Sequence, residues 1–431
     1  MEPQHNYTPG SSGMQQQIYG RKKSKRGCFI IGLLILLIFG GAGAYLVYFI
    51  YNKANNKLEE ITDKFKDLRD KDRFIGNRNE DKRFEGAFID AVIIPTTGTT
   101  SKVFILTDGS KTYIETKKRP GYYSTGAACI ECKTTAYLYD PAGDKIISNT
   151  DFKFPDIVTS TDIVKKDDRI YQFTRSYGET PAGINIYDAI TGNLLSETSD
   201  FINTYPELSP GVTELSYRKE ERIVKFETTD GRKDITFSVD MLKIFKNDKD
   251  LRTAQENSAE GEAFIYAMAN ENNDSRRQLY RITAPKKYVV SQASTLMSYS
   301  DRPNMLKQYK AASERVSDKS YIEGIIYFQD EDNVYIVSVD KAGKKANRIF
   351  TCIDAATGSE KWSVEQKELF DYMKIDEEQN SSQSFFSTKD KISVTASGNL
   401  VLLKIKGDGV MAFETETGKK LWSIQPAPVG L

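Results

Sequence analysis

Two cysteines three residues apart are the residues of this sequence best suited to chemistry. Cys129 and Cys132 form the motif CIEC within the segment STGAACIECKTTAYLYD. Such a pair can form a local disulfide, exchange disulfides with a partner, join a zinc site or remain as reduced thiols. In a domain that is exported from the cytoplasm, the disulfide is the favoured interpretation, because disulfides persist in oxidising compartments. A zinc site needs two further ligands, and Cys352 is the one cysteine that follows the motif.

Other chemistry is limited by the single histidine, His5, which lies close to the start of the chain. Ser-His-Asp catalysis, Cys-His catalysis and His-ligated metal sites are therefore excluded from the rest of the sequence. The acidic segments QDEDN (329–333) and NENND (270–274) do not match an EF-hand loop and are typical of solvated turns. We expect no catalytic residue, no metal site and no bound cofactor.

The overall charge argues against nucleic acid as a partner. Sixty Lys and Arg residues balance sixty Asp and Glu residues among 431. A chain without net charge generates no general field that attracts a polyanion. Its hydrophobic fraction of 39% is typical of a folded protein, and its length suits two or three ordinary domains or one large all-β domain with attachments.

An uncharged run of 24 residues, CFIIGLLILLIFGGAGAYLVYFIY (28–51), predicts a transmembrane helix. About 20 apolar residues suffice to cross a bilayer. The basic stretch RKKSKR precedes this run, so the positive-inside rule places the N-terminus in the cytoplasm and the remainder outside. A cleaved signal peptide is the alternative, because Ala42 and Ala44 fit a small-x-small cleavage site. We expect a single-pass protein of a bacterial cell membrane with an extracytoplasmic C-terminal domain.

The chain then divides into four parts: a disordered cytoplasmic tail (1–20), the basic flank and transmembrane helix (21–51), a stalk helix (52–75) and an exported domain (76–431). The stalk is predicted from an apolar stripe at helical spacing, formed by Ala54, Leu58, Ile61, Phe65 and Leu68. This stripe suits packing on the domain or on lipid headgroups, and the alternative is dimerisation as a short coiled coil.

A short pattern recurs along the exported domain. An apolar or aromatic residue and an acid precede a tight turn that contains glycine, and an apolar strand follows. The acid stands four residues before Gly192, Gly231, Gly358 and Gly418, and a shorter fifth copy ends at Gly143. Each copy predicts a β-hairpin in which glycine supplies a positive φ. Further strands precede these hairpins, so we expect meanders of three or more strands.

Both tryptophans belong to complete copies of the pattern, DAATGSEKW (354–362) and ETETGKKLW (414–422). Thr-Gly forms the turn, and the tryptophan on the next strand is expected to pack between neighbouring sheets. The residues of this blade-packing motif are Asp354, Thr357, Gly358, Trp362, Glu414, Thr417, Gly418 and Trp422.

These segments, and more weakly DAITGNLLS (188–196), resemble the repeat of quinoprotein-like (PQQ-like) β-propellers. The blade consensus of that family places acid-x-x-Thr-Gly before a tryptophan that packs between blades. The resemblance covers the exported domain and implies an all-β fold, a β-propeller of about seven or eight blades. The opening strand FEGAFIDAVII (84–94) is expected to complete the last blade and close the ring.

The family includes quinone-dependent dehydrogenases and non-catalytic scaffolds. A dehydrogenase of this family would carry a vicinal Cys-Cys disulfide, a tryptophan against the quinone and a calcium site, and this sequence has no Cys-Cys pair. Gly143 and Gly231 also lack the Thr and Trp of the consensus, with Ile147 and Ile235 in place of tryptophan.

The sequence therefore predicts a membrane-anchored extracytoplasmic propeller that binds a protein or an envelope partner on one face, without catalysis. The first alternative is a thiol-disulfide redox protein or sensor that uses Cys129 and Cys132. A quinone-dependent dehydrogenase is the second.

Overall fold

The computed structural model describes residues 81–96, 101–119, 122–156, 161–219, 221–258, 260–269, 276–286, 313–342, 346–365, 369, 392–427 and 429. All of them belong to the compact unit Asn77–Leu431, whereas the unit Met1–Gly76 contains no described residue. The predicted tail, transmembrane segment (28–51) and stalk (52–75) therefore lie outside the described residues. No helix within the described ranges is long and apolar enough to cross a bilayer.

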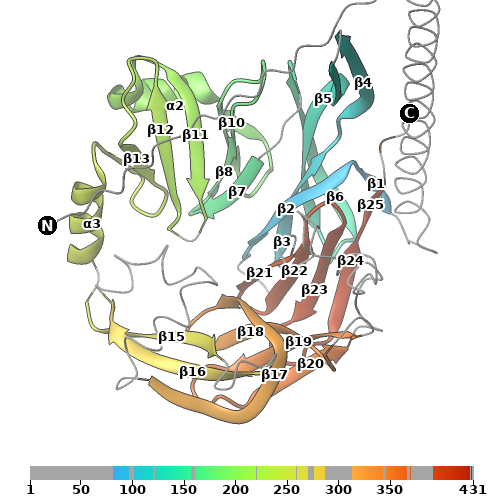
Figure 1. Cartoon of the computed structure of the whole chain (residues 1–431), viewed down its shortest axis with the longest axis vertical. Helices are drawn as coiled ribbons and strands as arrows, with labels where there is room; N and C mark the ends of the chain where they lie inside the picture. Colours follow the sequence, from blue (N-terminus) through green and yellow to red (C-terminus); the bar gives the residue numbers. More distant parts are fainter. Residues whose placement is uncertain are drawn as a thin grey trace, which may run out of the picture. The chain divides into compact units, whose positions relative to one another are not determined.

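Strands dominate the described ranges (Figure 1), and the expected all-β class is confirmed. The helical elements described between the strands are the short helices α2 (Thr198–Thr204), α3 (Asp248–Asn257) and the 3-10 turn η1 (Pro206–Leu208). The described strands form five antiparallel sheets of four or more strands, together with one two-stranded pairing.

The sheets follow one another in chain order, from β2 in blue to β24 in red (Figure 1). The first sheet has the order β2-β3-β5-β6, with β4 paired to the other half of β5. Its strands are β2 (Ala87–Ile94), β3 (Lys102–Asp108), β4 (Lys111–Arg119), β5 (Tyr122–Asp140) and β6 (Lys145–Phe154).

The second, third and fifth sheets are four-stranded meanders. The second contains β7 (Thr161–Lys166), β8 (Arg169–Thr174), β9 (Gly183–Asp188) and β10 (Leu194–Ser196). The third contains β11 (Val212–Arg218), β12 (Ile223–Thr228), β13 (Ile235–Ser238) and β14 (Lys243–Phe245). The fifth contains β21 (Ile392–Ser397), β22 (Leu400–Ile405), β23 (Gly409–Glu414) and β24 (Lys420–Ile424).

The fourth sheet has six strands and bends within its longest one. It runs through β15 (Glu262–Ala269), β16 (Arg276–Pro285), β17 (Ser313–Gln329), β18 (Asn333–Val339), β19 (Arg348–Asp354) and β20 (Glu360–Glu365). The N-terminal part of β17 pairs with β16 and its C-terminal part pairs with β18. The register slips near Glu323, which has a φ of 50°. A buried cluster that includes Met268 and Ile336 fills the space between the two halves.

Aromatic side chains join sheets that follow one another along the chain. Buried aromatic rings on facing strands of these sheets lie within stacking or edge-to-face distance of one another. The pairs, with their centroid separations, are Phe104–Tyr187 between the first and second sheets (5.0 Å), Tyr171–Phe237 between the second and third (6.2 Å) and Phe350–Phe413 between the fourth and fifth (5.6 Å).

The fifth sheet also packs against the first. One buried cluster contains Val410 and Ala412 of β23 together with Val103 and Ile105 of β3. Strand β2 contacts β21, β22 and β23. The two ends of the described chain therefore lie against one another, although most of the sequence separates them.

A parallel pair of short strands completes this contact. β1 (Asp81–Glu85) pairs with β25 (Pro426–Ala427), and the amide of Asp81 donates to the carbonyl of Gln425 at 2.8 Å. The expectation that segment 84–94 completes the last blade is wrong, because β1 and β25 form a separate two-stranded sheet and the fifth sheet consists of β21 to β24. The greater part of this segment is β2, the first strand of the first sheet, and only its first two residues belong to β1.

Candidate functional site

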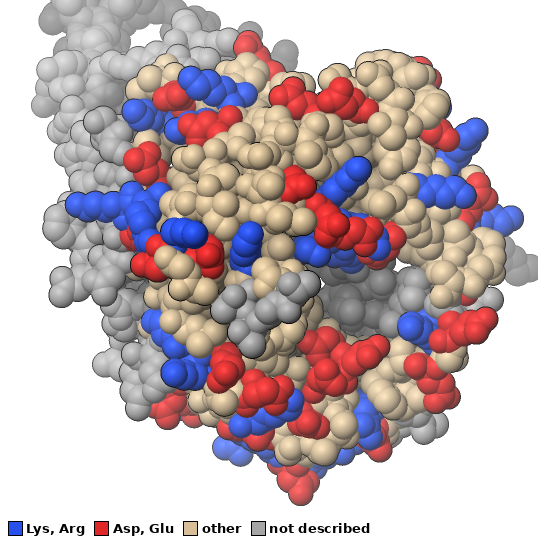
Figure 2. Space-filling model, turned by 180° about the vertical axis from the view of Figure 1, so that it is seen from behind, with Lys and Arg blue, Asp and Glu red and all other residues tan. Residues whose placement is uncertain are grey.

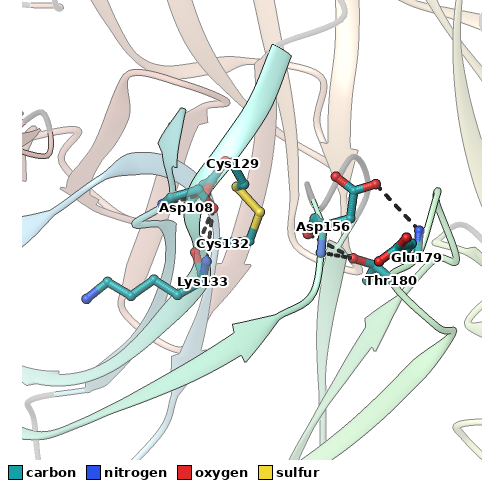
Figure 3. The surroundings of a disulfide bond; sticks show 8 residues. Asp108, Cys129, Cys132, Lys133, Asp156, Glu179 and Thr180 are labelled. Carbon is teal, nitrogen blue, oxygen red and sulfur yellow. Dashed lines mark hydrogen bonds between the residues drawn. A yellow bond between two sulfur atoms is a disulfide. The ribbon is translucent and has the colours of Figure 1, made fainter. Parts of the chain in front are cut away.

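Cys129 and Cys132 are joined as a disulfide bond in the structure (Figure 3). Both lie in β5, where that strand passes from its pairing with β4 to its pairing with β3 and β6. Cys129 stands opposite Thr112 of β4, and Cys132 stands opposite Phe154 of β6. The register of β4 and β5 slips beside Thr112, so the disulfide spans a β-bulge.

Hydrogen bonds and an ion pair hold the chain next to the disulfide independently of the sulfur atoms. The amide of Gly109 donates to the carbonyl of Lys133 at 3.0 Å, and the amide of Lys133 donates to the Ser110 hydroxyl at 3.0 Å. The Lys133 ammonium lies 2.8 Å from the Asp151 carboxylate. The turn between β3 and β4 is therefore fixed to β5 directly after Cys132.

The segments next to this disulfide carry exposed apolar side chains. Ile130, between the two cysteines, is 70% exposed, and Tyr113 on β4 is 47% exposed. Tyr177 is 53% exposed and belongs to a bend that also contains Thr180. Thr180 is hydrogen-bonded to the backbone of Asp156, and Figure 3 shows Thr180 and Asp156 in the surroundings of the disulfide. We call Tyr113, Ile130 and Tyr177 the disulfide surface. Exposed apolar groups are typical of protein contact sites where they form a contiguous patch.

Trp362 lies at the boundary between the fourth and fifth sheets. Its side chain is buried, and its indole Nε1 donates to the carbonyl of Thr415 at 2.7 Å. A Cβ atom added to Gly418 would lie 2.5 Å from the Trp362 ring. The turn of the second motif copy therefore rests directly on the tryptophan of the first copy.

Trp422 occupies the equivalent place at the boundary between the fifth and first sheets. It is partly buried, and its ring lies edge to face with Tyr139 at 5.7 Å. Tyr139 precedes the turn at Gly143, and its hydroxyl donates to Asp144 at 2.8 Å. Each tryptophan thus contacts the turn region of the following sheet.

The acids and threonines of the motif organise the turns. The amide and hydroxyl of Thr357 donate to Asp354 Oδ1 at 2.7 and 2.8 Å, and these hydrogen bonds lower the pKa of Asp354. The Thr417 hydroxyl donates to Glu414 in the same way. Gly358 and Gly418 have φ values of 71° and 67°.

The turn at Gly143 differs from the expectation. Gly192 and Gly231 have positive φ values of 75° and 84°, but Gly143 does not have a positive φ. Asp144 takes that conformation instead, with a φ of 45°. The turn here is one residue shorter, so the left-handed position falls on the residue after the glycine.

A buried cluster of charges is the strongest site that sequence reasoning missed. Lys404 on β22 is 1% exposed, and its Nζ donates to Asp90 Oδ1 at 2.5 Å and to the carbonyl of Ala91 at 3.0 Å. Lys219, directly after β11, lies 3.4 Å from the other oxygen of Asp90. The first, third and fifth sheets therefore meet at one carboxylate.

Burial and charge compete within this cluster. Burial acts to raise the pKa of Asp90, but the charges of Lys219 and Lys404 outweigh it and hold that pKa at about 2. Burial lowers the pKa of Lys404 to about 8, against the opposing charge of Asp90. Perturbed groups of this kind occur both at functional sites and in structural ion pairs. Because Lys404 is covered on all sides, the cluster is suited to holding the three sheets together.

The sequence carried a weak signal for this cluster. Lys404 interrupts the apolar run LVLLKI of β22, in which every residue is buried, and Asp90 interrupts AFIDAVII in β2. A lysine and an aspartate inside otherwise apolar strands require partners, because an isolated buried charge is costly. Their pairing could not be deduced, since 313 residues lie between them.

Within the described ranges the structure shows no set of ligands for the zinc or calcium sites considered from the sequence. No group of three or more His, Cys, Asp and Glu residues there is arranged to hold an ion. Cys352 is fully buried, and burial raises the pKa of its thiol to about 12. In the segment 329–333, Asp330 accepts hydrogen bonds from the amides of Asp332 and Asn333, as in a capped turn. The segment 270–274 lies outside the described residues.

No protein-family model matches the chain, and no curated protein matches it. Solved structures with some similarity include the computationally designed Ika8 protein, with 12% identity over 81% of this chain and 89% of that chain and a TM-score of 0.21. BamB from Moraxella catarrhalis is 11% identical over 78% of this chain and 75% of its own, with a TM-score of 0.20. The quinohemoprotein alcohol dehydrogenase ADHIIG from Pseudomonas putida HK5 is 11% identical over 70% of this chain and 58% of its own, with a TM-score of 0.18. The last two have PQQ-like β-propeller folds, but at these scores none of the likenesses carries an argument about this chain.

Proposed function

We propose that the unit Asn77–Leu431 is a closed, exported β-propeller, anchored by residues 28–51, that serves as a binding platform for a protein of the cell envelope. The observation that carries this proposal is the contact between the fifth and first sheets. Trp422 of the fifth sheet contacts Tyr139 of the first sheet. In the same way, Trp362 of the fourth sheet contacts the turn at Gly418 in the fifth sheet, which follows it in sequence. A seam that recurs across the chain ends is expected of a ring of equivalent modules.

We propose six modules, in place of the seven or eight expected from glycine spacing. Four described sheets supply one module each, and the bend in β17 divides the six-stranded sheet into two. The longest interval between turn glycines, from Gly231 to Gly358, then contains one additional module and a long connection between β16 and β17.

Export is supported by the sequence and by the disulfide. The basic residues that precede segment 28–51 favour a cytoplasmic N-terminus. The Cys129–Cys132 bond suits an oxidising compartment on the other side. Anchoring would hold the propeller close to the membrane, where proteins of the cell envelope are present as partners.

Binding is assigned to the disulfide surface because Tyr113 and Ile130 are exposed on the two-stranded ribbon of β4 and β5 and Tyr177 is exposed on the neighbouring bend. Residues 122–131 of β5 pair with β4, whereas β3 and β6 pair with the part of β5 that follows. On the face shown in Figure 2, basic and acidic side chains are interspersed and no large area carries one sign. Recognition by shape and apolar contact is therefore favoured over attraction of a charged polymer.

Photo-crosslinking in intact cells tests this function. A photoreactive residue at Ile130 or Tyr177 should give the same protein adduct, whereas the equally anchored chain carrying it at exposed Leu421 should not. Adducts that are absent at both disulfide-surface positions, or identical at all three positions, would contradict the proposed surface.

A further inference from the structure

The two cysteines of the disulfide differ in accessibility. Cys132 is 4% exposed, whereas Cys129 is partly exposed at the end of the β4–β5 ribbon. A thiolate that attacks a disulfide must approach one sulfur along the line of the bond. An approaching protein would therefore meet Cys129 first, with Cys132 behind it as the leaving group.

The fold does not depend on this bond for its local geometry. The disulfide closes a loop with a sequence separation of only 3, and short loops restrict the unfolded chain least. The backbone on the Cys132 side is already held by the Gly109–Lys133 hydrogen bond and by the pairing of Cys132 with Phe154, and on the other side Cys129 is paired with Thr112 of β4. The disulfide can therefore open and close while the first sheet stays folded.

The bulge also presents a docking group between the sulfurs. Ile130 is the most exposed of the large hydrophobic residues within the described ranges, and it lies directly between the two cysteines. An apolar side chain at this position is well placed to contact a protein whose own thiol reaches Cys129.

We propose that Cys129–Cys132 is a redox-active disulfide that exchanges with a dithiol-bearing protein docked on Ile130. The partner's thiolate attacks Cys129 Sγ, and the Cys129–Cys132 bond breaks. Cys132 Sγ takes the bonding electron pair and then a proton. The partner's second thiol next attacks the mixed disulfide and releases Cys129 as a thiol. The chain's disulfide is thus reduced by two electrons, and the partner's dithiol is oxidised to a disulfide.

This activity goes beyond the proposed binding function and does not require it. The envelope partner found by crosslinking need not be the dithiol protein. Failure of the exchange reaction would leave the crosslinking result unchanged, and the two proposals can therefore be rejected separately.

The test uses the full oxidised chain in detergent with reduced thioredoxin as the dithiol probe, and mass-tagging of free thiols as the readout. We expect thioredoxin to convert the disulfide to two thiols while circular dichroism shows the strand signal retained. Thioredoxin that keeps only its attacking cysteine should become trapped on Cys129, identified by mass spectrometry. Cys352, which is buried, serves as the internal control for unfolding.

Docking is tested by Ile130→Ser, which keeps both cysteines, against Leu421→Ser, a change at an exposed residue on another sheet. Trapping should slow about tenfold or more for Ile130→Ser, because burying such a side chain against a partner contributes that much. Leu421→Ser should leave the rate unchanged. A disulfide that resists thioredoxin until Cys352 also becomes reactive, trapping on Cys132, or equal rates for both variants would overturn the proposal.

Discussion

At the scale of single residues, the Asp90–Lys404 pair shows how a charge can be retained inside a β-sheet core. The lysine occupies a position in β22 where every neighbour along the strand is apolar and buried. Its ammonium is stabilised by one carboxylate and one carbonyl, both from β2. Removing one member of such a pair leaves the other buried without compensation.

Lys404→Met is therefore expected to lower the free energy of unfolding by about 3–5 kcal/mol at neutral pH. Urea unfolding of the full chain in detergent, followed by circular dichroism, measures this loss. Lys219→Met is the matched control and should cost at most about 1 kcal/mol, because Lys219 is half-exposed and solvent screens its charge. Equal losses for both variants would argue against a dominant Asp90–Lys404 pair.

The loss of stability in Lys404→Met should depend on pH. The folded-state pKa of Asp90, about 2, is below its ordinary 3.8, so its contribution is present above 3.8 and disappears as the pH falls toward 2. In Lys404→Met this contribution to stability is reduced, because the charge of Lys219 alone then opposes the effect of burial on the pKa of Asp90. The stability difference from wild type should be largest near neutral pH and should narrow below 3.8. A difference that stays constant across this range would show that Asp90 does not titrate as the contacts indicate.

At the scale of elements, the turn glycines Gly231 and Gly418 have unequal surroundings although both have a positive φ. A Cβ on Gly418 would meet the Trp362 ring at 2.5 Å, whereas a Cβ on Gly231 would meet nothing within 4 Å. Both glycines have positive φ values, which cost other residues about 1–2 kcal/mol. Both turns therefore need a residue that tolerates a positive φ. Gly418 must in addition lack a side chain, because it packs against Trp362 of the preceding sheet.

Gly231→Ala should destabilise the protein by about 1–2 kcal/mol, from backbone strain alone. Gly418→Ala should cost about 1–3 kcal/mol more, because the methyl group overlaps the indole. Thermal unfolding of the two variants side by side measures the difference. Adding Trp362→Phe to each variant should reduce the excess at position 418 and leave the cost at position 231 unaffected. Similar losses of stability at the two glycines would show that packing against Trp362 does not restrict position 418.

At the scale of the whole molecule, the proposed ring depends on contacts between the first and fifth sheets. Phe84 of β1 is fully buried at this boundary, with its ring 5.1 Å from Tyr137 and 5.5 Å from Tyr139. Arg83 beside it donates to Asp81 and Asp144, which links β1 to the turn after β5. The closure therefore combines a core aromatic, ion pairs and the β1–β25 pairing.

Phe84→Ala should destabilise the protein by about 3–5 kcal/mol, as expected for a buried phenylalanine. Phe201→Ala, in the buried cluster between the second and third sheets, is a matched control of similar size. Hydrogen exchange distinguishes them, because only Phe84→Ala should accelerate exchange in β1 and β25 more than elsewhere. Uniform acceleration in both variants would indicate that the boundary has no role of its own in closing the ring.

The predicted topology can be tested on intact cells. Protease added from outside should digest the unit Asn77–Leu431, while a tag placed at the N-terminus remains membrane-bound and protected. Protection of the large unit would contradict export. Loss of the tag from the membrane fraction would instead support the cleaved signal peptide.

The sequence alone determined the all-β class and the places where the hairpins turn. These features depend on residues close together in the chain, such as Asp354, Thr357 and Gly358, whose hydrogen bonds form within one turn. The basic flank and apolar run at the N-terminus are equally local signals, and they predict export without any knowledge of the fold.

Only the tertiary structure decided which sheets meet and what lies between them. The bend in β17, which we propose divides the six-stranded sheet into two modules, is not marked by any of the turn glycines of the repeat. The meeting of Asp90, Lys219 and Lys404 joins residues 129 and 314 positions apart. Strand pattern fixes which face of each strand is buried, but the partner of a buried charge is set by the packing of distant sheets, which no local pattern encodes.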